Sequence, residues 1–268
     1  CVLANARLSE RSARGYRRLG PLTRGMLGAL AAVAAQTRED ARRLAELGVP
    51  RERLEVTGSV KFDLRLPASL REQAQVLRRS LGVDRDVWIA ASTHEGEDEM
   101  VLDAFEALRG RHPEALLVLV PRHPERFSRV AALARRRELV TALRTGEPGE
   151  WEEAQVLVGD TMGELPLLYA AADVAFVGGS LVPVGGHNLL EPAALGLPVV
   201  MGPHLHNFAE IGRLLRERGG ATVVEDSAGL ARVVGAWLDD ANLRHQAGEA
   251  GRRVVEDNLA RCLPGLDH

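Results

Sequence analysis

The chain has 268 residues, enough for one large domain or two modest ones. With 46% apolar and 26% charged residues it has the composition of a soluble globular protein, and its formal net charge of −3 argues against a nucleic-acid-binding protein, which is usually clearly basic. The sequence contains no run of 18 apolar residues, so no membrane-spanning helix is expected.

The two ends of the sequence carry its only cysteines, Cys1 and Cys262, which form neither a disulfide framework nor a metal-ligand set. Residue 1 is a cysteine rather than methionine, and residues 1–4 read as the interior of a strand. We therefore expect a fragment whose N-terminal part, with any membrane anchor, is missing.

Before Pro67 the sequence predicts a small alternating α/β segment, and we place a domain junction at Pro67. The predicted elements are a strand at 2–4, an Arg-rich helical stretch at 7–30, a strand at 31–35, a helix at 37–47 and a strand at 54–57. Thr37 is the predicted N-cap of its helix, with Asp40 in the capping-box position.

After Pro67 short apolar strands alternate with helices, which predicts a parallel sheet covered on both faces. The predicted strands are 87–91, 115–120, 156–159, 174–178, 199–201 and 221–224, and the predicted helices are 95–110, 126–137, 162–172, 190–195, 208–218 and 228–239. Ligands of such sheets bind at the carboxyl ends of the strands. The motifs described below all follow a strand.

The first of these motifs is residues 92–97, Ser-Thr-His-Glu-Gly-Glu. A capping box explains part of it, with Ser92 as N-cap and Glu95 at the third helical position. Ser92 and His94 also stand where they would face a ligand, so both remain candidate site residues.

The second motif is a rigid loop in which Pro121 and Pro124 enclose Arg122. Arg122 is predicted to neutralise a phosphate through paired N–H groups. The alternative is a surface turn with a solvated arginine.

The third motif, residues 159–165, opens a predicted helix, with Thr161 and Glu164 in capping-box positions. Gly163 in the first turn costs about 1 kcal/mol relative to alanine. The compensation we expect is close approach of the backbone to a phosphate or a base edge.

The most informative segment is residues 176–192, where an apolar strand enters a Gly-rich loop that ends at Asn188 and Glu191. Glycines let the backbone approach a ligand closely, and a helix start attracts an anion. Glu191 can accept two hydrogen bonds at once, as a ribose diol requires. The combination predicts a nucleotide-sugar site.

No metal-ligand spacing of His or Cys is present in the sequence. The charge of a leaving phosphate is then expected to be met by Arg122, Lys61 and helix N-termini. Lys61 is the only lysine among 34 basic residues, which favours a role that arginine cannot fill, with chance as the alternative.

Together these segments resemble the Kdo transferases (3-deoxy-D-manno-octulosonic acid transferases of lipopolysaccharide synthesis). The resemblance implies a two-domain α/β fold of GT-B type. In that fold 67–268 is a Rossmann-like parallel sheet with helices on both faces that binds CMP-Kdo, and 1–66 is the C-terminal remnant of an acceptor-binding domain, the tail of a second Rossmann-like domain. The matching runs are 5–12, 58–63, 92–97, 121–127, 159–164 and 178–192.

The resemblance further implies an inverting, metal-independent enzyme that moves Kdo from CMP-Kdo to a lipid A precursor (lipid IVA) at the cytoplasmic face of the bacterial inner membrane, with no cofactor. Lys61 and Arg122 would stabilise charge, and the catalytic base would be a glutamate of the missing N-terminal part. The resemblance places the CMP contacts at Pro121, Arg122, Met162, Gly163, Glu164, Asn188, Leu189, Leu190 and Glu191. Further donor-site candidates are Ser92, His94, Gly179, Ser180, Gly186 and His187.

The predicted partners are CMP-Kdo, the lipid A precursor and a membrane surface, with no nucleic acid. The membrane contact is expected through the missing N-terminus and the stretch Arg7–Arg24, for which a solvated Arg-rich helix is the alternative. Two other functions stay open: a UDP-sugar-dependent GT-B transferase or epimerase, and a donor-binding fragment that is inactive by itself. Preference for UDP over CMP, or turnover by the chain alone, would distinguish them.

Overall fold

The computed structural model describes residues 1–57 and 66–262. The chain forms two compact units, Cys1–Leu64 with Val255–His268, and Arg65–Val254. The domain boundary between residues 66 and 67 remains a prediction. Lys61 lies outside the described residues.

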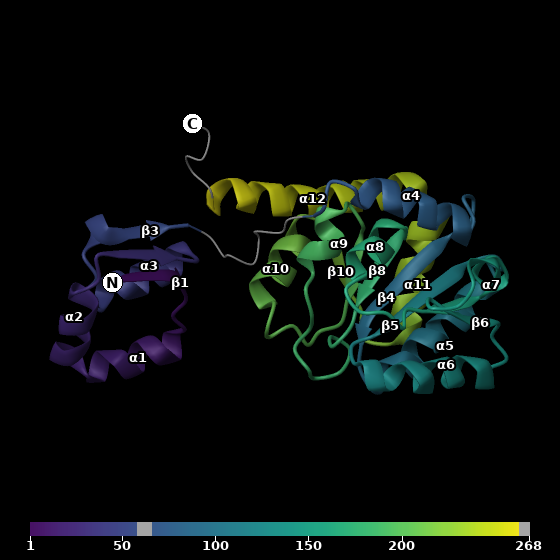
Figure 1. Cartoon of the computed structure of the whole chain (residues 1–268). Helices are drawn as coiled ribbons and strands as arrows, with labels where there is room; N and C mark the ends of the chain where they lie inside the picture. The colour runs from purple at the N-terminus through teal and green to yellow at the C-terminus, as the bar shows by residue number, and fades with distance from the viewer. Residues whose placement is uncertain (58–65, 263–268) are drawn as a thin grey trace. The chain divides into compact units, whose positions relative to one another are not determined.

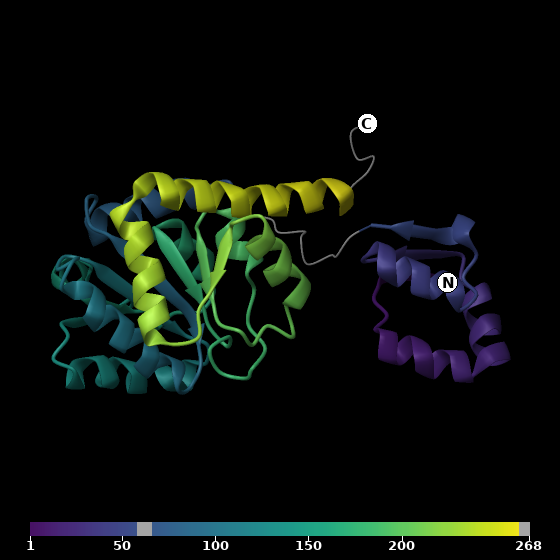
Figure 2. The same cartoon turned by 180° about the vertical axis from the view of Figure 1, so that it is seen from behind.

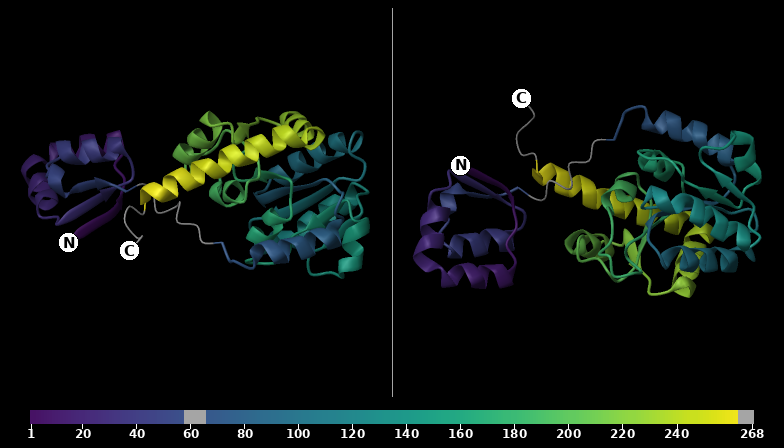
Figure 3. Two further views of the ribbon diagram at one scale, coloured as in Figure 1. Left: turned by 90° about the horizontal axis from the view of Figure 1, so that it is seen from above. Right: turned by 60° about the horizontal axis from the view of Figure 1, so that its bottom comes forward.

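The N-terminal unit contains a three-stranded parallel sheet in the order β1-β2-β3, which Figure 3 shows with its helices beside it. Its apolar centre includes Leu8, Val33 and Leu44, all buried. Its elements are β1 (Val2–Ala6), α1 (Glu10–Arg18), α2 (Gly20–Gly28), β2 (Ala32–Ala35), α3 (Arg38–Glu46), a 3-10 turn at Arg51–Arg53 and β3 (Leu54–Val56).

Two local predictions in this unit have different outcomes. The N-cap at Thr37 is confirmed: its hydroxyl accepts a hydrogen bond from the Asp40 N–H at 3.0 Å. The prediction of a single helical stretch at 7–30 is wrong, because α1 ends before Leu19 and a second helix, α2, begins at Gly20, with Pro21 in its first turn. Proline lacks the N–H that would continue a helix but suits the first turn of a new one.

The larger unit contains a seven-stranded sheet in the order β10-β9-β8-β4-β5-β7-β6, with every pair parallel. Its strands are β4 (Val87–Thr93), β5 (Leu116–Pro121), β6 (Thr141–Leu143), β7 (Val156–Val158), β8 (Val174–Val177), β9 (Val199–Met201) and β10 (Ala221–Val223). The central strands are continuous apolar runs, as expected for a sheet buried on both faces.

Helices cover both faces of this sheet, as predicted (Figure 1). Trp88, Phe105 and Trp237 belong to the core on the face of α5 and α11, while Leu157 and Tyr169 belong to the core on the other face. The helices are α4 (Leu70–Leu81), α5 (Glu97–Arg109), α6 (Phe127–Arg136), α7 (Pro148–Glu153), α8 (Leu165–Ala170), α9 (Leu190–Ala194), α10 (Ala209–Glu217), α11 (Ser227–Asp239) and α12 (Ala241–Cys262), of which residues 241–254 belong to this unit.

Several elements of this unit were not predicted from the sequence, namely α4, β6, α7 and α12. Figure 2 shows α11 leading almost directly into the long helix α12. No helix in the described part of the chain is long and apolar enough to span a lipid bilayer.

Two predicted capping boxes are wrong. Helix α5 begins at Glu97 after Gly96, whose φ is 91°, so Ser92 does not cap it and Glu95 does not lie at its third position. Helix α8 begins at Leu165, and Glu164 is itself the N-cap residue, without a side-chain cap. Thr161 instead donates its hydroxyl hydrogen to the Glu164 carboxylate at 2.6 Å.

Candidate functional site

The predicted motifs lie side by side, because the strands that precede them are neighbours in the sheet. β9, β8, β4, β5 and β7 are adjacent in that order, and parallel strands end at the same edge (Figure 1). The chain passes from β4 to β5 on one side, whereas β8 pairs with β4 on the other. The sheet therefore has a topological switch point between β4 and β8, the place where open α/β sheets bind ligands.

The carboxylate of Glu97 anchors the loop that follows β8. The side chain is fully buried. It accepts hydrogen bonds from the N–H groups of His94 (2.9 Å), Gly179 (2.7 Å), Ser180 (3.0 Å) and Leu181 (2.9 Å). Four donors from both sides of the switch point thus converge on one anion, which fixes the two loops relative to each other.

Gly178 makes this arrangement possible through close approach. A Cβ at Gly178 would lie 2.6 Å from the Ser92 carbonyl oxygen and 2.9 Å from the Glu97 carboxylate. Ser92 has a φ of 56°, in the left-handed region that non-glycine residues rarely adopt. The backbone is strained at the end of β4, as is frequent at functional sites.

A pair of imidazoles spans the switch point. The Nε2 atoms of His94 and His187 lie 2.7 Å apart, and the two rings are parallel within 3°. The ring of His123, from the loop after β5, contacts His94 edge-on with centroids 5.5 Å apart. Gly179 packs directly against the pair, because a Cβ at this position would lie 2.9 Å from the His187 ring.

Both imidazoles of the pair are harder to protonate than a free histidine. Burial, then the neighbouring His94 and the positive charge of Arg122, lowers the pKa of His187 to about 4. Burial also lowers the pKa of His94, against the opposing effect of Glu97. At neutral pH the pair is therefore uncharged, with one Nε2–H donating to the other ring.

Arg122 is an exposed cation beside this pair. Its backbone N–H donates to the Thr93 carbonyl at 3.0 Å, which fixes the loop. Its guanidinium forms no ion pair or hydrogen bond with any residue that the structure describes. The nearby Arg126, by contrast, is bound to Asp98 and to the Thr93 carbonyl. Arg122 is thus left available for an anionic ligand.

Asp98 and Thr93 form a buried hydrogen-bonded pair next to the loop that follows β5. The sequence did not lead us to predict this pair. The Thr93 hydroxyl donates to Asp98 at 2.6 Å, and Arg126 pairs with the other carboxylate oxygen. Burial raises the pKa of Asp98, while the bonds from Thr93 and Arg126 oppose that shift. The adjacent acids at positions 97 and 98 were the available signal in the sequence.

The loop after β7 presents Met162 and Gly163 to solvent. Met162 is 66% exposed, and Gly163 has a φ of 82° with open space where a Cβ would lie. Glu164 is held by Arg144 at 3.0 Å and by Thr161. The exposed backbone at Gly163 is free of steric hindrance for a flat ligand.

Asn188 and Glu191 lie at the start of α9, and both side chains are half-buried. The Asn188 amide donates to Glu191 Oε1 at 3.0 Å, and its oxygen accepts from the Leu190 N–H. Glu191 Oε2 has no hydrogen-bond partner in the described part of the chain and is not fully buried. Burial raises the pKa of Glu191, and the bond from Asn188 limits the shift.

The remaining predicted site residues are buried. Leu189 and Leu190 are fully buried, so only their backbone can reach a ligand, and Pro121 is buried as the last residue of β5. The Ser180 hydroxyl is buried, donates to the Val177 carbonyl and accepts from the Gly202 N–H. Gly186 is also buried, with a φ of 77°.

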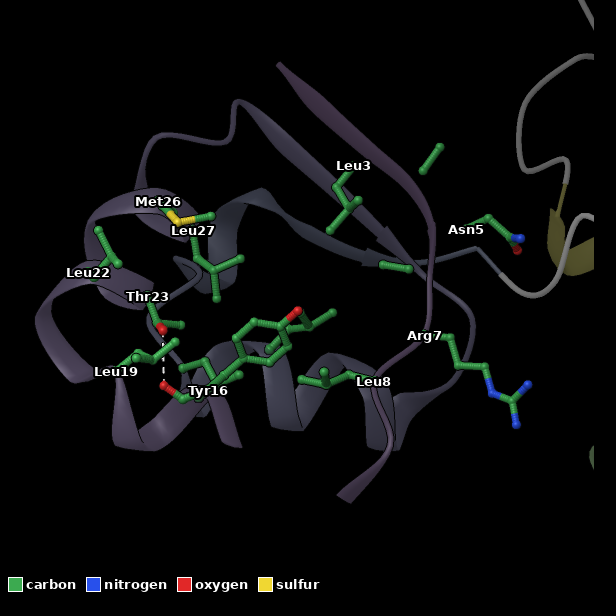
Figure 4. Close-up of a pocket in the computed structure, with 14 residues that line it drawn as sticks. Leu3, Asn5, Arg7, Leu8, Tyr16, Leu19, Leu22, Thr23, Met26 and Leu27 are labelled. Atoms are coloured by element: carbon green, nitrogen blue, oxygen red, sulfur yellow. Dashed lines mark hydrogen bonds between the residues drawn. The ribbon is translucent and has the colours of Figure 1, made fainter. Parts of the chain in front are cut away.

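The N-terminal unit has an apolar cavity of about 450 Å³ (Figure 4). Tyr16, Leu19, Leu22 and Met26 line it, while Arg7 extends away from these apolar side chains. Its apolar lining does not match a nucleotide phosphate. Among the described residues, no group of three or more His, Cys, Asp or Glu side chains is arranged to hold a metal ion.

Comparisons with known proteins agree with this fold. A family model described as glycosyl transferases group 1 matches residues 90–254, and the model of 3-deoxy-D-manno-octulosonic-acid transferase (kdotransferase) matches residues 1–64. The chain belongs to the group 1 glycosyltransferases, with the predicted α/β fold of GT-B type.

Within that class the chain belongs to the Kdo transferase family, as predicted. It is 45% identical to the 3-deoxy-D-manno-octulosonic acid transferase of Haemophilus influenzae over 99% of this chain and 62% of the relative. The crystal structure of the C-terminal CMP-Kdo binding domain of WaaA from Acinetobacter baumannii covers 71% of this chain and all of that domain, at 32% identity and a TM-score of 0.66.

A more distant structure shows the fold alone. Anabaena Alr3699/HepE in complex with UDP and glucose covers 97% of this chain and 68% of its own, at 15% identity and a TM-score of 0.52. The chain spans about three fifths of the length of the curated Kdo transferases that it matches, 62% for those of H. influenzae and Bordetella pertussis.

Proposed function

We propose that the chain binds CMP-Kdo at the carboxyl edge of its seven-stranded sheet and forms the donor half of an inverting, metal-independent Kdo transferase. The observation that carries this proposal is that two side chains follow strands of the switch-point edge with groups left over for a ligand: within the described part of the chain the Arg122 guanidinium has no ion pair, and Glu191 Oε2 has no hydrogen bond. The relative from A. baumannii, described as a CMP-Kdo binding domain, supports the choice of ligand.

In this proposal each part of the site meets one part of the donor. Arg122 binds the phosphate, Glu191 Oε2 accepts a hydrogen bond from the ribose, and the backbone at Met162 and Gly163 lies against the nucleotide. Glu164, Asn188, Leu189 and Leu190 complete the proposed CMP contacts. Lys61, outside the described residues, is kept as a second charge stabiliser.

The proposed reaction breaks the bond between the anomeric carbon of Kdo and the phosphate oxygen of CMP. The acceptor hydroxyl forms the new bond on the opposite face, and its proton passes to a general base. The anomeric carbon carries oxocarbenium-like positive charge, as in glycoside hydrolysis. Arg122 stabilises the negative charge that develops on the departing CMP. The family resemblance assigns the base to a glutamate of the N-terminal domain, and we propose no residue of this chain for it.

The acceptor in this proposal is a lipid A precursor, and the reaction takes place at the cytoplasmic face of the inner membrane. Exposed arginines of the N-terminal unit, including Arg7, Arg11 and Arg18, support contact with lipid phosphates.

The test of the donor site is calorimetric titration of the chain with CMP and with UMP. We expect CMP to bind more tightly, and Glu191→Ala to weaken CMP binding roughly tenfold or more, because a hydrogen bond to a charged group is lost. Glu153→Ala, an exposed carboxylate on α7, is the matched control and should bind as the wild type does. Equal binding of both nucleotides, or a preference for UMP, would instead indicate a UDP-sugar enzyme.

A further inference from the structure

The cluster at the switch point contains more potential positive charge than a single phosphate requires. Arg122 is a permanent cation without an internal partner in the described part of the chain. Beside it lie His94 and His187, with His123 against the first of them. The proposed donor carries two anionic groups on one carbon, because the anomeric carbon of a 2-ulosonic acid holds both its carboxylate and the phosphate. A donor site must therefore hold two anions side by side.

The imidazole pair can accept one proton without losing its internal hydrogen bond. One ring donates Nε2–H to the Nε2 lone pair of the other at 2.7 Å, so the donating ring has a lone pair on Nδ1. A proton added at that Nδ1 leaves the bond between the rings intact and turns both Nδ1 atoms into N–H donors. Neither Nδ1 has a hydrogen-bond partner among the described residues, and neither is fully buried.

The charged groups around the pair keep it neutral while no ligand is present. The pair is desolvated, and Arg122, Arg126 and His123 disfavour a further positive charge, while Glu97 favours it. The carboxylate of Glu97 is already used by four backbone N–H groups. An anion that settles beside the pair changes this balance, because an opposite charge within a few ångströms favours the protonated imidazole.

We propose that the His94–His187 pair is the subsite for the carboxylate of the donor sugar, and that the pair takes up one proton from solvent when this carboxylate binds. The inference rests on the proposed function and assigns the second anion of the same donor. Arg122 holds the phosphate, and the protonated pair holds the carboxylate through its Nδ1–H groups. The site thus distinguishes a nucleotide-linked sugar acid from an uncharged sugar by requiring the second anion.

Because a proton is taken up on binding, the affinity for the sugar acid is expected to depend on pH. In the free chain burial lowers the pKa of both imidazoles, that of His187 to about 4, and the bound carboxylate raises the pKa of the pair. Between these two pKa values the affinity for the sugar acid rises as the pH falls, by at most about tenfold per pH unit for one proton. Above both values the gain is absent.

The experiment is calorimetric titration of the chain with CMP and with CMP-Kdo at several pH values, each in two buffers with different heats of ionisation. The variants are His187→Gln and His94→Gln, whose side-chain amide is polar but cannot be protonated. His245→Gln, an exposed histidine of α12, is the matched control. Because the phosphate of CMP itself titrates near pH 6, wild type and variants are compared with the same ligand.

We expect the wild type and His245→Gln to take up close to one proton with CMP-Kdo beyond any taken up with CMP, and to bind CMP-Kdo more tightly at lower pH. In His187→Gln the extra proton and the pH dependence disappear while CMP affinity stays near that of the wild type, and this unchanged affinity shows that the variant is folded. If His187→Gln does not fold, His94→Gln decides by the same criterion.

Two results would overturn the inference while leaving the donor site in place: wild-type pH dependence in a folded variant, or an equal loss of affinity for CMP and CMP-Kdo. Failure of the wild type to bind CMP at all would overturn the proposed function and the inference with it. The relative's domain has a solved structure by itself, so the corresponding part of this chain is a suitable sample.

Discussion

At the scale of single residues, the site is organised around the buried carboxylate of Glu97. From the sequence alone Glu97 could not be distinguished from Glu95, because both acids lie at the predicted start of a helix. The structure separates them: the Glu95 side chain is 71% exposed and pairs with Arg129, while Glu97 is buried and binds both loops of the switch point. Glu97 is therefore a positioning residue of the site.

Replacing Glu97 tests this role. Glu97→Gln keeps the shape of the side chain but turns an –NH₂ donor toward backbone N–H groups that need an acceptor. We expect a loss of roughly 3 kcal/mol or more in the free energy of unfolding, typical of a broken buried charge network. Urea denaturation measures this loss.

The control for that change is Glu95→Gln, which removes one exposed ion pair with Arg129. Exposed pairs of this kind are worth about 0–1 kcal/mol. A loss of stability in Glu97→Gln no larger than in Glu95→Gln would contradict the anchoring role.

Replacing Glu191 is expected to change stability and nucleotide binding in opposite directions. Because burial raises its pKa in the folded chain, Glu191 favours folding when it is protonated, and that contribution is lost as the pH rises from the ordinary glutamate pKa through the raised one. Glu191→Gln keeps the oxygen that accepts from Asn188 but removes the buried charge.

We therefore expect Glu191→Gln to unfold at a higher temperature than the wild type at neutral pH, with the difference shrinking toward pH 4, and to bind CMP more weakly. Thermal unfolding across pH, with the nucleotide titration beside it, measures both effects. A variant that is less stable than the wild type at neutral pH would show that the carboxylate is structural. Such a trade-off between stability and binding is common at functional sites.

At the scale of elements, the sequence predicted the strands of the sheet well and several helices poorly. The central strands are continuous apolar runs bounded by glycines and prolines, which is a strong signal. β6 and α7 contain only three and six residues, too few to show a period. Helix α4 had a readable pattern, with Leu70, Ala74, Leu77 and Leu81 buried on one face, but it directly follows the predicted junction.

Helix α12 escaped prediction for a physical reason. Its packing uses small residues rather than a stripe of large apolar ones, so its sequence shows weak periodicity. A Cβ at Gly248 would lie 1.9 Å from the Gly196 carbonyl oxygen, and Gly251 packs against Gly220. Close backbone contact of this kind has no signature in hydrophobic patterning.

Gly248→Ala tests this packing. The added methyl group has no space against the loop after α9, so we expect a loss of about 1–3 kcal/mol in the free energy of unfolding. Gly149→Ala, in α7 with open space around it, is the matched control. It should leave stability unchanged or raise it by up to about 1 kcal/mol, as alanine favours a helix over glycine. Equal effects of the two changes would show that α12 does not depend on close approach.

For the candidate site, too, some features could be predicted from the sequence and others could not. Motifs at strand ends were visible in sequence, and parallel strands bring their ends to one edge. The contact between His94 and His187, which are 93 residues apart, depends on β8 pairing with β4 rather than with β7, the strand that precedes it in sequence. Strand order is a property of the whole sheet, so no local pattern encodes it.

At the scale of the whole molecule, the arginines of the N-terminal unit bear on where the protein acts. Arg11, Arg14 and Arg18 are exposed and share one face of α1, at spacings of three and four residues, while Ala13 is buried. Arg14 pairs with Glu10, but Arg11 and Arg18 form no ion pair within the described part of the chain. Their charge is available to an anionic surface.

The double variant Arg11→Ala/Arg18→Ala decides whether that face meets a membrane. Each arginine near an anionic bilayer contributes about 1 kcal/mol, so we expect the double variant to lose about 2 kcal/mol of binding free energy to vesicles that contain phosphatidylglycerol, measured by co-sedimentation. Pure phosphatidylcholine vesicles should bind neither form. The control, Arg136→Ala/Arg232→Ala, removes the same charge from exposed positions on α6 and α11 of the larger unit. Equal weakening by both pairs would mean that only net charge matters, and unchanged binding in the first pair would leave these residues as a solvated helix face.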